Sequence, residues 1–98
     1  MKTIGFVDFF IDEWHANTYP GLIKNYNEKF GTDFQVKYAW AEIDGPVDKK
    51  TTKEWCDAFG AEQCDTIAEL CKKADYVVTG QWAKKAYKEA ARYGAARV

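Results

Sequence analysis

Short apolar runs separated by longer amphipathic stretches make up most of this chain. The runs at residues 3–8, 34–41 and 75–79 have the length and composition of strands buried in a parallel sheet. A brief strand is expected within residues 61–65, and residues 95–98 are expected to begin a fifth. Residues 42–46 supply turn chemistry after the second strand. The pattern therefore predicts strand and helix alternating four times, followed by the start of a further strand.

The stretch between the first two predicted strands has a helical spacing. From residue 12 to residue 30, one row of side chains recurs at every fourth position, with Ile23 beside it; the row is Trp14, Thr18, Leu22, Tyr26 and Phe30. This spacing predicts a helix whose row of side chains faces a core, ended by a glycine in the left-handed conformation at position 31. A proline at position 20 lies inside the pattern, so the helix is either kinked there or starts afresh with that proline in its first turn.

Capping motifs mark the helices that follow. Thr51 and Glu54 match a capping box, as do Thr66 and Glu69, and each pair precedes an apolar helical face. The glycines expected to end or introduce later helices are Gly60, Gly80 and Gly94. These signals predict two short helices and a longer last one.

Strands that alternate with helices of this length imply βαβ units, whose right-handed crossovers place helices on both faces of a sheet. We therefore predict the α/β class, as a three-layer α/β/α Rossmann-like sandwich with a doubly wound parallel sheet of four to five strands. With 98 residues, 47% of them hydrophobic, residues 1–98 are expected to form a single domain.

Charge and composition narrow the classes of partner. Lys plus Arg number 14 against 15 for Asp plus Glu, so no excess of positive charge favours nucleic acid. Neither a signal peptide nor an apolar run of membrane-spanning length is present in the sequence, which predicts no membrane association. Three cysteines without a paired spacing, and without a neighbouring base, favour a reduced cytoplasmic protein in which the thiols are buried packing groups.

Ligands of doubly wound sheets bind at the carboxyl ends of the strands, near the point where strand order reverses. Here that rule selects the loops that follow residues 8, 41 and 79. The candidate dinucleotide contacts are Asp8, Phe9, Phe10, Ile11, Asp12, Glu42, Asp44, Thr79 and Gly80. NAD or NADP is the cofactor that these positions would serve.

The first of these loops lacks the glycines of a phosphate-binding turn. Asp8, Asp12 and Glu13 instead place three carboxylates where a phosphate needs donors. Helix capping is the favoured role for the latter two, and packing is favoured over base stacking for Phe9 and Phe10.

Two further assignments involve acidic residues. Glu42 or Asp44 stands where a carboxylate would accept hydrogen bonds from an adenosine ribose, although either can equally be an ordinary turn residue. Asp8, Asp12 and His15 have the side chains of a divalent metal site, but a structural role is favoured and no metal ligand is predicted.

Several segments resemble a known oxidoreductase family. They are a His-Ala pair at residues 15–16, the acidic residue Asp44, the helix at residues 65–70 and the strand at residues 74–78. Together they look like the N-terminal domain of the Gfo/Idh/MocA family, which includes glucose-fructose oxidoreductase and inositol dehydrogenase. The resemblance implies a Rossmann domain that holds NAD or NADP, joined to a larger domain that binds a sugar or polyol.

Departures from the family pattern bear on activity. Val7, Phe9 and Asp12 stand where the resemblance would place the phosphate-binding glycines. The family's Glu-Lys-Pro segment, with its catalytic lysine, would lie beyond Val98, so no catalytic residue is assigned and the chain alone is expected to be inactive.

Two classes of function therefore remain open. The first is a dinucleotide-binding domain of a sugar or polyol oxidoreductase. The second is a noncatalytic Rossmann-like scaffold or interaction domain, natural, truncated or engineered, that binds no dinucleotide and forms a homodimer through an exposed sheet edge.

Overall fold

The structure, a computed structural model, describes residues 2–79 apart from the side chain of His15. Four parallel strands form one sheet in the order β3-β2-β1-β4. They are β1 (Lys2–Asp8), β2 (Phe34–Ala41), β3 (Glu62–Gln63) and β4 (Tyr76–Thr79). The predicted helix after Gly80 and the predicted strand at residues 95–98 lie outside the described residues.

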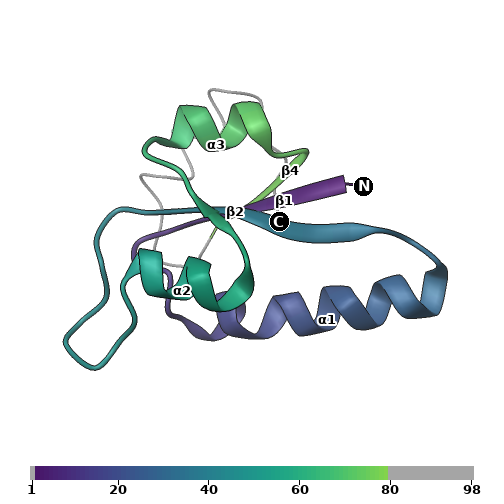
Figure 1. The fold of residues 1–98 in the computed structure, drawn as a ribbon, viewed down its shortest axis with the longest axis horizontal. Coiled ribbons are helices and arrows are strands. Elements are labelled where there is room, and N and C mark those ends of the chain that lie inside the picture. Colours follow the sequence, from purple (N-terminus) through teal and green to yellow (C-terminus); the bar gives the residue numbers. More distant parts are fainter. Residues whose placement is uncertain (1, 80–98) are drawn as a thin grey trace.

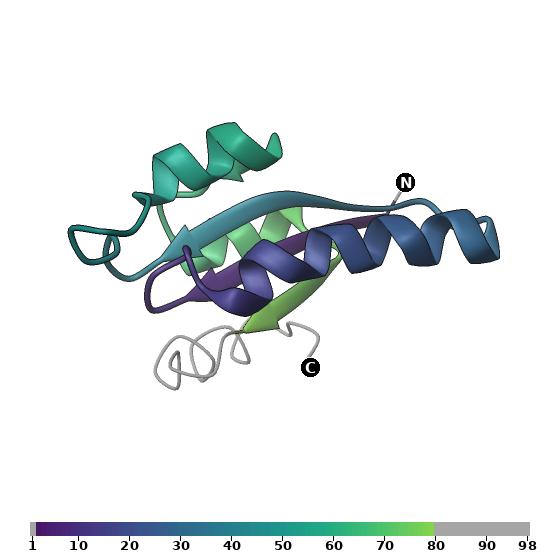
Figure 2. The same ribbon diagram turned by 90° about the horizontal axis from the view of Figure 1, so that it is seen from below.

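Three helices cover the two faces of this sheet. α1 (Trp14–Phe30) and α2 (Thr52–Phe59) lie on one face, and α3 (Ile67–Lys73) lies on the other (Figure 1). The view turned by 90° shows α1 running along β1 and β2, with α2 beside it (Figure 2). The described residues therefore confirm the predicted three-layer, parallel α/β fold.

Neighbouring residues of β1 supply two separate cores. Phe6 points to the α1 and α2 side, where it contacts the ring of Trp55 at 5.9 Å between centroids. Val7 points to the opposite side and packs with Leu70 of α3 and Val77 of β4. Because successive side chains of a strand alternate between faces, β1 is buried on both sides.

Most of the predicted helix ends are confirmed. Thr51 and Glu54 form a complete capping box at the start of α2, while Gly31 and Gly60 end α1 and α2 in the left-handed conformation. At α3 the Thr66 side chain accepts a hydrogen bond from the Glu69 backbone as expected, but the Glu69 carboxylate accepts its own bond from the backbone of Asp65.

The predicted core-facing row of α1 was wrong. Trp14, Leu22, Tyr26 and Phe30 are 71, 53, 49 and 58% exposed, whereas Ala16 is fully buried and Ile23 packs against the core. A spacing of four residues advances about 40° beyond a full turn at each step, so such a row winds around the helix instead of keeping to one face. Pro20 is accommodated within the continuous helix.

Tyr26 and Phe30, the last two residues of the predicted row, belong to an aromatic cluster on the surface. Tyr26 contacts Phe30 at 4.6 Å and Phe34 at 6.1 Å between ring centroids, and Phe34 contacts Tyr76 at 6.0 Å. These contacts connect the last turns of α1 with the first residues of β2 and β4.

The close approach of α3 to the sheet gives a test of this packing. A Cβ atom at Gly5 would lie 2.6 Å from Cδ2 and 2.9 Å from Cγ of Leu70, which is itself fully buried. Gly5→Ala is therefore expected to lower the free energy of unfolding by about 1–3 kcal/mol, measured by urea denaturation followed by circular dichroism.

Gly21→Ala is the matched control for that substitution. A Cβ at this α1 position has no neighbour within 4 Å, so alanine is expected to stabilise the helix by about 0.5–1 kcal/mol. Equal stability of the two variants would contradict the described contact between β1 and α3.

Candidate functional site

The carboxyl end of β1 is the switch point of the sheet. β2 and β4 flank β1, and the chain reaches them through helices on opposite faces. In folds of this kind, the crevice for a ligand opens where the connections diverge in this way. The segments near it are the loop at residues 9–13, the loop at residues 42–51, and Thr79 at the end of β4.

The structure divides the predicted site residues into buried and accessible groups. Asp8 is 1% exposed and Ile11 is fully buried in the core beneath α1 and α2. Phe9 and Phe10 are half-buried and meet edge to face at 6.1 Å, in keeping with the packing role predicted for them. Glu42 and Asp44 are exposed, Thr79 is half-buried, and Gly80 lies outside the described residues.

Backbone hydrogen bonds tie the loop after β1 to the chain that leaves β2. The Glu42 N–H donates to the Asp8 carbonyl at 3.0 Å, and the Ile43 N–H donates to the Phe9 carbonyl at 2.9 Å. These bonds continue the β1–β2 pairing past the ends of both strands. The loop at residues 9–13 is thereby fixed on its β2 side.

Asp12 connects this loop to both nearby helices. Its Oδ2 accepts a hydrogen bond from the Lys50 backbone N–H at 2.8 Å, and its Oδ1 accepts one from the Asn17 side chain at 2.7 Å. Asn17 in turn accepts a hydrogen bond from the Trp55 indole N–H at 3.0 Å. The Lys50 bond, and next the Asn17 bond, lower the pKa of Asp12 below its usual value.

These contacts correct the expected capping role of two acidic residues. The N-cap of α1 is Glu13, but its side chain makes no capping hydrogen bond, and the first turn of the helix contains no acidic residue. Asp12 binds across the loop instead, because its carboxylate reaches the backbone before α2. A carboxylate thus already occupies donors of the kind that a phosphate would use.

Asp44 accepts a hydrogen bond at the N-terminus of α2. Its Oδ1 accepts a hydrogen bond from the Thr52 backbone N–H at 2.9 Å, which satisfies one of the free donors at the start of that helix. The turn role considered for this residue is therefore present in the structure. Glu42, on the same loop, presents its carboxylate at the exposed surface.

Asp8 is a buried acidic residue at the end of β1. Its Oδ1 accepts a hydrogen bond from the Phe9 N–H at 2.8 Å. Burial raises the pKa of Asp8, and this effect exceeds the opposing influence of the Glu13 side chain and of the Phe9 N–H.

Two of the cysteine thiols, those of Cys56 and Cys64, are buried. Burial raises the pKa of the Cys56 thiol to about 11 and that of Cys64 to about 12, which leaves both thiols protonated.

Within residues 2–79, one group of side chains could hold a metal ion: the ligand atoms of Glu62, Cys64 and Glu69 lie within 4.8 Å of one another. Lys73 pairs with Glu62, and the backbone of Asp65 donates to Glu69, so these carboxylates already have protein partners.

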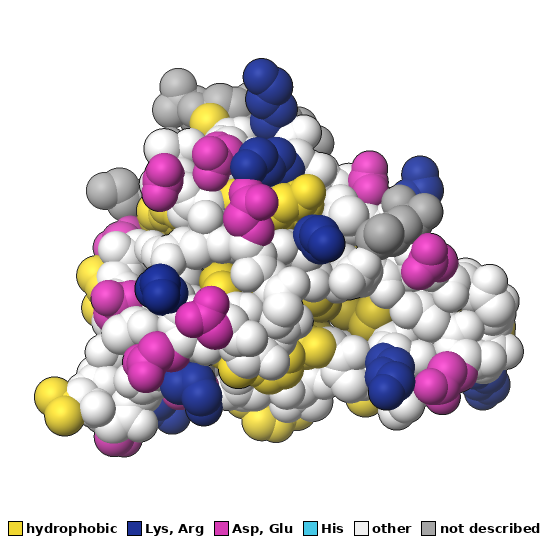
Figure 3. Space-filling view, viewed as in Figure 1, with side chains coloured by type: hydrophobic (Ala, Val, Ile, Leu, Met, Phe, Trp, Pro, Cys, Tyr) yellow, Lys and Arg dark blue, Asp and Glu magenta, His cyan; other side chains and the backbone are white. Residues whose placement is uncertain are grey.

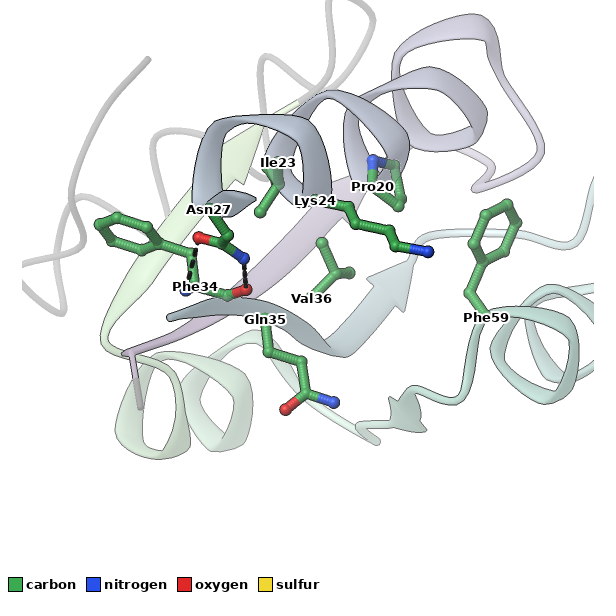
Figure 4. A pocket seen from close by; sticks show the side chains of 8 residues that line it. All are labelled: Pro20, Ile23, Lys24, Asn27, Phe34, Gln35, Val36 and Phe59. Atoms are coloured by element: carbon green, nitrogen blue, oxygen red, sulfur yellow. Dashed lines mark hydrogen bonds between the residues drawn. The ribbon is translucent and has the colours of Figure 1, made fainter. Parts of the chain in front are cut away.

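A groove lies between α1 and α2, over the first residues of β2 (Figure 4). It has a volume of about 220 Å³ and is lined by Pro20, Ile23, Lys24, Asn27, Phe34, Gln35, Val36 and Phe59. The Asn27 side chain bonds both the N–H and the carbonyl of Phe34, which fixes one wall. This groove is at the opposite end of the sheet from the switch point, and no sequence motif indicated it.

Surface character agrees with the near-zero net charge. Acidic and basic side chains are interspersed over the face seen in Figure 3, and this view shows no continuous basic patch among the described residues. No helix within residues 2–79 combines the length and apolar character needed to cross a membrane.

Comparison of the chain with protein-family models, with curated proteins and with solved structures found no match. The features of the molecule that bear on its function are therefore the strand order and the groups at the carboxyl end of β1.

A substitution of Asp12 tests the hydrogen bonds that join the loop at residues 9–13 to α1 and to the segment before α2. Asp12→Ala is expected to lower the free energy of unfolding by about 1–3 kcal/mol at neutral pH, because the Lys50 N–H and the Asn17 amide lose their acceptor. Its lowered pKa means that this stabilisation is present above the unfolded-state pKa and is lost as the pH falls through the folded-state pKa.

Urea denaturation near neutral pH and again in acid measures both effects. Asp48→Ala, which removes the same charge at an exposed site in the neighbouring loop, is the control and is expected to change stability little. A similar loss in both variants would contradict the bridging role of Asp12.

Proposed function

We propose that this chain is the dinucleotide-binding domain of an NAD(P)-dependent oxidoreductase that acts on a sugar or polyol. The observation that carries the proposal is the strand order β3-β2-β1-β4, with α1 and α3 on opposite faces, because folds of this topology bind their ligands at the carboxyl end of the strand at the switch point, here β1. The resemblance of the sequence to the Gfo/Idh/MocA family supports the substrate class. A cytoplasmic location is part of the same proposal.

The residues around the end of β1 suit the two ends of a dinucleotide unequally. The exposed Glu42 carboxylate is suited to accept hydrogen bonds from ribose hydroxyl groups. The loop at residues 9–13 does not fit a pyrophosphate in the usual way, since it has no glycine and Asp12 already occupies two donors. We therefore derive no catalytic step through the cofactor, and expect the isolated chain to be inactive.

A scaffold without cofactor is the second candidate, and the Asp12 contacts favour it. In this alternative the domain serves as an interaction module and forms a homodimer through β4. Within the described residues β4 pairs with β1 alone, so it is an edge strand of the described sheet, and such an edge is where a further strand adds. Sedimentation of the purified chain over a range of concentrations measures that association.

A titration with NADH and NADPH separates the two candidates. We expect saturable binding in the micromolar range, detected by quenching of tryptophan emission and by energy transfer to the nicotinamide, with calorimetry as a check. Asp12→Gly is expected to lower the Kd roughly fivefold, since removing one charge near a phosphate in a hydrated site changes the binding free energy by about 1 kcal/mol.

Asp48→Gly is the control for that substitution, because it alters an exposed acidic residue of the loop after β2, outside the loop at residues 9–13. Binding should be measured where circular dichroism shows each variant to be folded. Absence of binding at millimolar cofactor in both the original chain and Asp12→Gly would reject the dinucleotide proposal and leave the scaffold.

A further inference from the structure

The groove between α1 and α2 opens about one helical turn beyond the point where the two helices are joined. At that point the Trp55 indole N–H donates to the Asn17 side chain at 3.0 Å. Farther along each helix, Pro20 of α1 and Phe59 of α2 border the groove, and Val36 of β2 forms its floor (Figure 4). The described residues therefore leave a recess of about 220 Å³ between two helices whose spacing is fixed at one end.

The walls of this groove are apolar and held in place. Val36 is 8% exposed and belongs to the core on this side of the sheet, and Ile23 packs against the same core. The Phe59 ring stacks on the buried Trp55 ring at 4.6 Å between centroids, which fixes the orientation of the exposed part of Phe59. A ligand in the groove would therefore meet apolar side chains that are already ordered, which reduces the entropic cost of binding.

Lys24 is the one charged residue among the described residues that line the groove. Its side chain extends across the groove in the direction of Phe59 (Figure 4). Within residues 2–79 the ammonium group of Lys24 forms no ion pair, and no acidic side chain belongs to the lining. The groove thus presents one positive charge that the surrounding side chains do not neutralise.

The two amide side chains of the lining are directed elsewhere. Asn27 donates to the Phe34 carbonyl at 2.7 Å, and its oxygen accepts from the Phe34 N–H and the Thr32 hydroxyl, each at 2.9 Å. The Gln35 side chain extends from β2 away from α1 (Figure 4), as alternation along a strand requires for the residue before Val36. An apolar recess with one cation is complementary to a molecule that has an apolar body and a single negative charge.

We propose that this groove binds a small aromatic monocarboxylate, whose ring lies between Ile23 and Phe59 and whose carboxylate pairs with the Lys24 ammonium group. A cavity of about 150 Å³ accommodates benzene, so a groove of about 220 Å³ has room for one ring and a short acid chain. This inference goes beyond the proposed function, because the groove is a second site at the opposite end of the sheet from the switch point.

An NMR titration of the whole chain with phenylacetate tests the assignment. The bound ring should shift the methyl resonances of Ile23 and Val36 in a saturable manner, with a Kd on the order of 1 mM for a ligand of about ten non-hydrogen atoms. Phenylacetamide keeps the shape and lacks the charge, so it should bind roughly fivefold more weakly. Equal affinities for the acid and the amide, or no saturable shift at about 10 mM ligand, would overturn the proposal.

Lys24→Met separates the charge from the packing, since methionine keeps an unbranched apolar side chain. In this variant phenylacetate should bind roughly fivefold more weakly than in the original chain, while the affinity for phenylacetamide stays the same. Lys29→Met is the matched control, because Lys29 is an exposed residue of the same helix that lies over the Phe30 ring and does not line the groove. Equal phenylacetate affinities in the two variants would overturn the proposal.

The same variant keeps this proposal distinct from the dinucleotide proposal. Lys24 does not belong to the segments around the end of β1, so the NADH titration of Lys24→Met should match that of the original chain, with or without binding. A loss of NADH binding that accompanies the loss of phenylacetate binding would show a shared site and overturn the assignment of a second one.

Discussion

Burial of β1 on both faces is the constraint on which the other features of this structure depend. Phe6 and Val7 belong to different cores, and each core needs its own helical layer to exclude water. The strand between these layers leaves little access for solvent even at its last residue, Asp8. The acidic side chain at the end of β1 therefore cannot be hydrated like an ordinary loop carboxylate, and burial raises its pKa.

The fold was predictable because its signals are local. Apolar runs gave the strands, and capping boxes and glycines gave the ends of α2, where Thr51 and Gly60 occupy the expected positions. The buried face of α1 was not predictable from the row of every fourth residue. Of the residues expected on that face Ile23 does pack against the core, but tertiary packing buried Ala16 and left the larger Trp14 in solvent.

The candidate site was predictable in location and less so in chemistry. Parallel strands alone direct attention to the loop after Asp8, since the carboxyl ends of adjacent strands meet at one edge. The partners of Asp12 could not be foreseen, because Lys50 is 38 residues away along the chain and bonds through its backbone.

The hydrogen bond between Asn17 and the Trp55 indole gives this protein an internal optical reporter. Trp55 is fully buried, and Asn17 connects its ring nitrogen to the carboxylate of Asp12 in the loop after β1. A rearrangement of that loop alters the electrostatic field at the indole and hence the wavelength of its emission. Trp14 is largely exposed and would respond to quenchers in the solvent, so the two rings report on different regions of one helical layer.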